Sequence, residues 1–290
     1  MSIEIPVAYV QQFRDNAIVL SQQKGSRLSN AVRLETVTGK YYHFERIGAT
    51  TAVKRTTRHS KTPLVNSPHS RRRVSMDDYE WADLVDTQDK VRMLIDPQSS
   101  YAINAAYALG RTKDDIILDA LRGNAYSVDS ADSQSAVPLP SAQKVAIGST
   151  PTYLTIDKIL AAKYIFDHAD VDPDEERYLA LSAQEVQTLL NTTEVKSADY
   201  NTVKALAAGQ INTFAGFNFI RTERLYSASS VRYCLAWVKS GVGLAVGQEV
   251  QTRIDERVDM SYAMQVYLCM TCGATRIEDE KVVEIAVKTA

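Results

Sequence analysis

The stretch that decides the fold runs from residue 97 to residue 123 and reads PQSSYAINAAYALGRTKDDIILDALRG. Asp96 precedes it as a good N-cap, and Pro97 takes the first helical position, where its missing N–H costs nothing. Gly123 closes the stretch and suits the C′ position. The sequence therefore predicts one helix of about 26 residues, which at roughly 1.5 Å per residue is a rod of roughly 39 Å.

The apolar residues of this stretch share one side of the predicted helix. They recur near i, i+3 and i+4 spacing, which is typical of an amphipathic helix that packs on a core. The many alanines allow a close approach of whatever packs against it. The residues that this spacing places on the packed face are Tyr101, Ala105, Ala108, Leu109, Thr112, Ile116, Ala120 and Leu121.

A strongly basic segment precedes the helix. Between Lys40 and Arg73 the chain has nine lysines and arginines against one acid, Glu45, so this segment carries +8 in a chain of net charge −2. Such asymmetry is typical of an arm that meets nucleic acid or an acidic partner, which in a self-assembling protein can be another copy. The nine residues are Lys40, Arg46, Lys54, Arg55, Arg58, Lys61, Arg71, Arg72 and Arg73.

Two stretches with strand character flank the centre of this basic segment. Residues 36–47, TVTGKYYHFERI, are β-rich in composition, and residues 71–83 carry apolar residues in rough period-two spacing. Between them, residues 52–69 are basic and rich in threonine, and Pro63 and Pro68 interrupt them. The sequence therefore predicts a long hairpin or extended loop, whose tip buries little and stays mobile until it meets a neighbour.

The rest of the chain mixes helices and strands, which indicates an α+β fold. Residues 1–35 are predicted to form a polar arm, because their apolar content is too thin for a core. Predicted helices occupy residues 155–167, capped by Thr155, 182–191, with Ser182 and Glu185 as a capping box, and 199–208. Predicted strands occupy residues 144–147, 177–181, 217–221, 232–238, 262–272 and 282–287, and Gly273 is expected to end the fifth.

Composition limits the class of protein. The 290 residues are 45% hydrophobic and 23% charged, which suits one large folded domain or two interleaved ones and excludes a wholly disordered chain. No stretch approaches 18 consecutive apolar residues, and the N-terminus lacks the pattern of a secretory signal. Three cysteines, an odd and low number, indicate synthesis in a reducing cytoplasm.

Two patterns resemble ligand-binding motifs but have simpler interpretations. Gly241, Gly243 and Gly247 lie one residue off the dinucleotide-binding spacing and lack its strand–turn–helix unit, so we interpret them as glycines of a tight turn. Cys269 and Cys272 form a C-x-x-C pair, but a structural zinc site needs a second pair. On a strand the two thiols also point to opposite faces.

Two further groups are polar rather than catalytic in this interpretation. The aspartates at 170, 172 and 174 lack the glycine and the distal glutamate of a calcium loop, so they predict a solvated acidic loop. The histidines at 43, 59, 69 and 168 have no nucleophile context beside them. We therefore expect no catalytic residue, no metal and no cofactor.

Taken in order, these elements resemble the Hong Kong-type fold of tailed-bacteriophage major capsid proteins, over nearly the whole chain. Local strings that resemble the family are RYLALSAQEVQTLLN (177–191), GFNFIRTERL (216–225), WVKSGVGLAVGQEVQTRIDERVDM (237–260) and CGATRIEDEKVVEIAV (272–287). The resemblance implies an N-terminal arm at 1–35, an extended E-loop at 36–85, a peripheral domain at 86–149 with its spine helix at 97–122, an axial domain at 150–260, and return strands of the peripheral domain at 261–290.

The resemblance also implies a function and its partners. Copies of the chain would form hexamers and pentamers of an icosahedral head shell around double-stranded DNA, contacted without sequence specificity. The nine basic residues would bind neighbouring copies through the E-loop. A portal protein and a separate scaffolding protein are implied, with a decoration protein left open. The chain would be made in the host bacterial cytoplasm and end in the virion, without membrane contact.

Two alternatives share parts of this pattern. An encapsulin, which is a cellular nanocompartment that encloses a cargo enzyme, would have the same fold. A basic-armed DNA-binding protein would explain Arg71, Arg72 and Arg73 as phosphate contacts, although no aromatic residues are interleaved at the basic tip.

Overall fold

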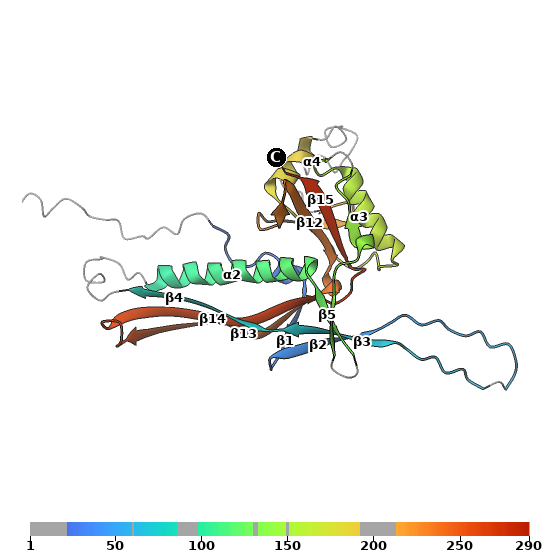
Figure 1. Ribbon diagram of the computed structural model, residues 1–290, viewed down its shortest axis with the longest axis horizontal. Coiled ribbons are helices and arrows are strands. Elements are labelled where there is room, and N and C mark those ends of the chain that lie inside the picture. The colour runs from blue at the N-terminus through green and yellow to red at the C-terminus, as the bar shows by residue number, and fades with distance from the viewer. Residues whose placement is uncertain are drawn as a thin grey trace, which may run out of the picture. The chain divides into compact units, whose positions relative to one another are not determined.

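The computed structural model describes residues 22–59, 61–85, 98–129, 133–148, 151–191 and 213–289. These residues form the predicted α+β fold, with helices and three β-sheets (Figure 1). Most of the predicted arm and the predicted helix at 199–208 lie outside the described residues. The chain divides into two compact units, each built from separate segments: residues 78–112 and 248–271 belong to the first, and residues 27–77, 113–247 and 272–289 to the second.

The long helix is present as α2 (Gln98–Arg122). Ala105, Leu109 and Leu121 are buried as predicted, whereas Tyr101, Ala108, Thr112, Ile116 and Ala120 are only half-buried. In the second half of α2 the buried apolar residues are Ile117, Leu118 and Leu121. At about 100° per residue these lie more than about 90° around the helix from Ala105. The prediction of a single packed stripe was wrong, because the buried side of α2 changes near Thr112, where the chain passes from the first unit into the second.

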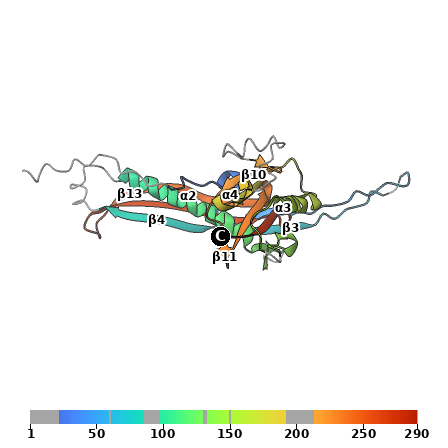
Figure 2. The same cartoon turned by 90° about the horizontal axis from the view of Figure 1, so that it is seen from above.

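One four-stranded sheet has the order β1 (Arg33–Thr36), β13 (Val242–Arg257), β14 (Ala263–Arg276) and β4 (Asp77–Val85). Within the first unit, α2 lies alongside β4, β13 and β14 in both views (Figures 1 and 2). The predicted strand at 262–272 lies in β14 from Ala263 onward, and residues 266, 268, 270 and 272 are all buried on one face of it.

Gly273 does not end β14, which continues to Arg276. A side chain at this position would place Cβ 2.0 Å from the carbonyl oxygen of Ser75. The glycine is therefore explained by a close approach of two backbones within the sheet region, and not by a strand break.

The predicted basic hairpin is confirmed as β2 (Tyr41–Ile47) paired with β3 (His69–Ser75) in an antiparallel register. β5 (Ala125–Val128) and β6 (Gln134–Val137) continue this sheet in the order β2-β3-β5-β6. Beyond Ile47 the N–H of Gly48 donates to the carbonyl of Pro68 over 2.8 Å. The described residues between these two form a long loop without strands, coloured blue in Figure 1.

A small apolar core lies under the hairpin. Phe44 and Val74 pack with Val37, Met76, Ala245 and Ile277 in one buried cluster. Gly243 lies in β13 directly against this cluster, since a Cβ there would be 2.3 Å from Cζ of Phe44. Gly243 is thus a strand glycine required by packing, and the tight-turn interpretation holds at most for Gly241, which ends a short 3₁₀ turn.

The third sheet belongs entirely to the second unit. Its order is β7 (Lys144–Val145), β15 (Val282–Lys288), β12 (Val231–Val238), β8 (Arg177–Leu181), β10 (Phe217–Arg221) and β9 (Thr213–Phe214), with β11 (Ser227–Ala228) paired to β12. The predicted strands at 177–181, 217–221, 232–238 and 282–287 are confirmed, and the one at 144–147 is shorter than predicted.

Both caps expected on the shorter helices are at least partly present. α3 (Ile156–His168) begins after Thr155, whose hydroxyl accepts from the N–H of Lys158. α4 (Ala183–Asn191) follows Ser182, and the Ser182 N–H donates to the Glu185 carboxylate over 2.9 Å, which is one half of a capping box. Satisfying these N–H groups allows each helix to begin where the sequence places it.

Candidate intersubunit surface

The loop between β2 and β3 offers an exposed, unpaired surface. Every described residue from 47 to 69 is exposed, apolar ones included. Leu64 is 97% exposed and Val53 60% exposed. Large apolar side chains held in water are typical of a surface that a partner covers. We call residues 49–67 the arm tip.

Four of the nine predicted basic residues lie in the arm tip. Lys54, Arg55, Arg58 and Lys61 are all exposed, and none forms an ion pair with another described residue. The only recorded side-chain hydrogen bond among them is local, from Nε of Arg55 to the carbonyl of Thr57 over 3.0 Å. Their charges are therefore not neutralised within the described part of their own chain.

The hairpin stem holds the other five basic residues, and four of these are engaged near the surface. Arg71 forms an exposed ion pair with Glu45 at 3.2 Å. Arg73 lies 3.5 Å and Lys40 5.4 Å from the centre of the Tyr41 ring, as cation–π contacts. Arg46 donates to the carbonyl of Ile277 over 2.8 Å. The basic residues of the stem therefore contact groups of their own chain. The four basic residues of the arm tip form no ion pair with a described residue.

Arg72 differs from its neighbours because it points into its own subunit. It is 3% exposed, and its Nη2 lies 2.6 Å from Oδ2 of Asp279. Burial lowers the pKa of Arg72, and the Asp279 carboxylate opposes that shift. The interpretation of Arg72 as an intersubunit contact is therefore corrected: on a strand it faces away from Arg71 and Arg73, toward the core under the hairpin.

We expect Arg72→Ala and Arg71→Ala to differ sharply in stability. Loss of Arg72 should lower the free energy of unfolding by roughly 2–3 kcal/mol, less than the roughly 3–5 kcal/mol for an orphaned buried charge, since Arg276 still pairs with Asp279. Arg71→Ala, which removes only an exposed pair, should cost less than about 0.5 kcal/mol. Urea denaturation of dispersed subunits measures both. Equal losses would refute the buried role of Arg72.

A second buried arginine, Arg276, was not singled out from the sequence. It is fully buried at the end of β14 and pairs with Asp279 at 2.5 Å. Its guanidinium also donates to three backbone carbonyls, those of Leu121, Gly123 and Val137, over 3.2, 2.8 and 2.9 Å. It thereby joins the end of α2, the connection that leads to β5 and the end of β6 within the second unit.

An acidic loop lies between α3 and β8. Asp167, Asp170, Asp172, Asp174, Glu175 and Glu176 fall within ten residues, and all but the half-buried Glu175 are exposed. Asp167 pairs with Arg177, Glu175 with Lys281 and Glu176 with Lys239. The aspartates at 170, 172 and 174 form no ion pair among the described residues, so the predicted solvated acidic loop is confirmed as an exposed, negatively charged surface.

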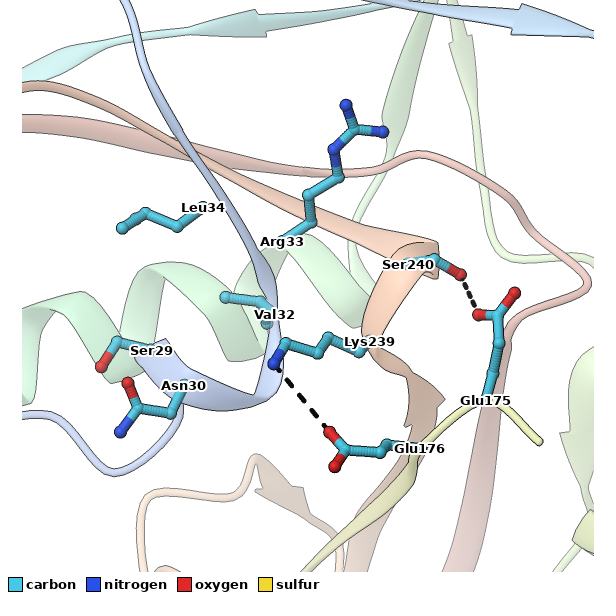
Figure 3. A pocket seen from close by; sticks show the side chains of 9 residues that line it. All are labelled: Ser29, Asn30, Val32, Arg33, Leu34, Glu175, Glu176, Lys239 and Ser240. Atoms are coloured by element: carbon cyan, nitrogen blue, oxygen red, sulfur yellow. Dashed lines mark hydrogen bonds and ion pairs between the residues drawn. The ribbon is translucent and has the colours of Figure 1, made fainter.

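A groove of about 720 Å³ separates this loop from β1. Val32 and Leu34 line it from the β1 side and Glu175 and Glu176 from the loop side, and Lys239 reaches toward Glu176 between them (Figure 3). Leu34 is 53% exposed. The groove therefore combines an apolar wall with a wall of two glutamates, each of which pairs with a lysine.

The other candidate groups are not brought together. Cys269 is half-buried and Cys272 buried, on opposite faces of β14, and all three cysteines are free. The described residues contain no cluster of three or more His, Cys, Asp or Glu that could hold a metal ion. No described helix has the length and apolarity to cross a membrane.

These features together indicate a protein that binds partners through an exposed hairpin tip, which carries both cations and apolar side chains. Residues 5–289 match the phage capsid protein family, and the chain belongs to that family. No curated protein matches the sequence. The chain is thus a phage capsid protein, a structural component of the virion.

Solved structures with the same fold come from several phages at low sequence identity. The capsid of Ralstonia phage GP4 is 10% identical, with a TM-score of 0.75 over 100% of this chain and 98% of that one. The cyanophage P-SCSP1u capsid is 15% identical, with a TM-score of 0.74 over 97% and 94%. A structure from Mycobacterium phage Che8 is 17% identical, with a TM-score of 0.71 over 96% and 97%.

Proposed function

We propose that this chain is the major capsid protein of a tailed phage and that its copies form hexamers and pentamers of an icosahedral shell around double-stranded DNA. The observation that carries the proposal is the family match over residues 5–289. Because the matching family is one of phage capsid proteins, the match also favours a phage capsid protein over an encapsulin, which would share the fold. The role is structural and not enzymatic.

The arm tip supplies the contact between copies in this proposal. Each subunit would donate its tip on one side and accept a neighbour's tip on the other, which is a heterologous contact that closes rings. The tip loses conformational entropy when it becomes ordered on docking, and this loss offsets part of the favourable contact energy. Many repeated contacts around a closed shell still give a stable particle. Lys54, Arg55, Arg58 and Lys61 are the basic residues we assign to this contact.

The domain assignment stays part of the proposal. Residues 36–85 would be the E-loop, residues 86–149 and 261–290 the peripheral domain, and residues 150–260 the axial domain, with an N-terminal arm at 1–35. A separate scaffolding protein, a portal and packaged DNA would be its partners. The protein would be made in the host cytoplasm before it enters the virion.

Negative-stain electron microscopy of the purified chain, expressed with and without its phage's scaffolding protein, tests the proposal. Closed shells or rings of five and six subunits are expected. Dispersed subunits under both conditions, together with a salt-dependent shift of duplex DNA, would instead favour the DNA-binding alternative that the four tip cations allow.

A further inference from the structure

β1 presents an open sheet edge. It pairs in parallel with β13 through Arg33–Thr36, and it stands at the end of the strand order. No strand in the described part of the chain pairs with its outer edge. Unpaired backbone N–H and C=O groups along such an edge can accept one more strand from another chain.

The arm tip contains a stretch suited to become that strand. Residues 50–58 read TTAVKRTTR, and four threonines and one valine give them β-branched character without a proline. They are exposed, and among the described residues their backbone groups have one hydrogen-bond partner, because the carbonyl of Thr57 accepts from Nε of Arg55. An extended segment with free backbone groups lowers its free energy when it adds to an open edge.

Charge complementarity favours this pairing over other occupants. The stretch 50–58 carries three cations and no acid. The groove beside β1 has Glu175 and Glu176 on its wall, but Lys281 and Lys239 already pair with them. The adjoining loop adds Asp170, Asp172 and Asp174, which form no ion pair among the described residues and can attract the cations of the stretch. Leu34 offers an apolar contact for a residue such as Val53.

We propose that residues Thr50–Arg58 of one copy add as a strand to the outer edge of β1 in a neighbouring copy. Their cations would face the acidic loop of Asp170, Asp172 and Asp174 beside the groove. This inference rests on the proposed function and names the site where the arm tip docks. The added strand becomes the new edge of the sheet, so only every second N–H of the stretch points toward β1.

A proline scan tests the strand directly. Single variants at Thr50, Thr51, Ala52 and Val53 keep the net charge and disturb no recorded hydrogen bond of the isolated subunit. Proline is tolerated on an edge strand only where the N–H faces solvent. We therefore expect two of the variants, at alternate positions, to reduce the shell yield about tenfold or more, and the two between them to assemble normally.

Disulfide trapping locates the acceptor. Leu34→Cys combined with a cysteine at residue 51, 53 or 57 should give covalent multimers in assembled shells under mild oxidation, in at least one register. Tyr164→Cys, another exposed position in the second unit, is the matched control and should give none with the same partners.

The outcomes separate the inference from the function it rests on. If arm-tip deletion abolishes shells but the proline scan shows no alternation and Leu34→Cys forms no cross-link, the tip docks elsewhere and the β1 inference is overturned. Normal shells after arm-tip deletion overturn the proposed role of the tip itself. Alternation together with cross-links to Leu34→Cys supports the strand addition.

Discussion

Subunits from which residues 50–66 are deleted should fold normally and form no closed shells. The deleted residues that the structure describes are exposed and lie outside the strands, and the hydrogen bond from the N–H of Gly48 to the carbonyl of Pro68 keeps the ends of the hairpin close enough for a short Gly-Ser turn. We expect the free energy of unfolding to change by less than about 0.5 kcal/mol, as for surface changes away from packed groups. Electron microscopy and thermal denaturation measured by circular dichroism check the two halves of this expectation.

A matched variant separates length from chemistry. Replacing residues 50–66 by a Gly-Ser segment of equal length keeps the reach of the hairpin and removes its cations and apolar side chains. This variant should fail to assemble as completely as the deletion. Normal particles from either variant would exclude the arm tip as the contact that holds copies together.

Arg276→Leu should be the most destabilising single substitution in the second unit. It leaves three backbone carbonyls without this donor and removes the fully buried partner of Asp279, so we expect a loss of roughly 3–5 kcal/mol in the free energy of unfolding. Arg276→Lys should recover part of this loss, because an ammonium keeps the charge but cannot reach all the carbonyls at once. Urea denaturation of dispersed subunits measures both variants.

Arg253→Leu is the control for this experiment. Arg253 is exposed on β13, so its substitution should leave the urea midpoint unchanged. An Arg276→Leu subunit as stable as the Arg253→Leu subunit would show that the carbonyl contacts of Arg276 do not hold α2, β5 and β6 together.

Local signals predicted most of the elements. The long helix, the capped α3 and α4, the strand at RYLAL and the alternation along β14 follow from short-range rules of capping and periodicity. The α+β class and the hairpin followed from their order. What failed depended on the tertiary structure: the buried side of α2 changes near the point where the chain passes from one unit into the other.

Arg72 and Arg276, two of the three buried arginines among the described residues, show which signal was present and not used. Arg72 lies an even number of residues from the buried Val74 and Met76, and Arg276 lies an even number of residues from the buried Leu268 and Cys272. Period-two spacing along a strand therefore places both guanidinium groups on buried faces. Gly273 is different, since only the approach of the Ser75 carbonyl explains it, and no local pattern reports that contact.

The site itself was predictable as a charge pattern but not as a geometry. The sequence separates the basic arm from the acidic remainder. It does not show which cations form ion pairs. Arg72 pairs with Asp279, which lies about 200 residues further along the chain and is brought close only by tertiary packing. Lys54, Arg55, Arg58 and Lys61 form no ion pair with a described residue.

The most direct test is a cryo-electron microscopy reconstruction of the assembled shell in which residues 49–67 can be traced. Our account predicts that these residues lie on a neighbouring copy, within contact distance of its surface in every hexamer and pentamer. An arm tip that packs only on its own subunit, or that contacts no protein, would contradict it.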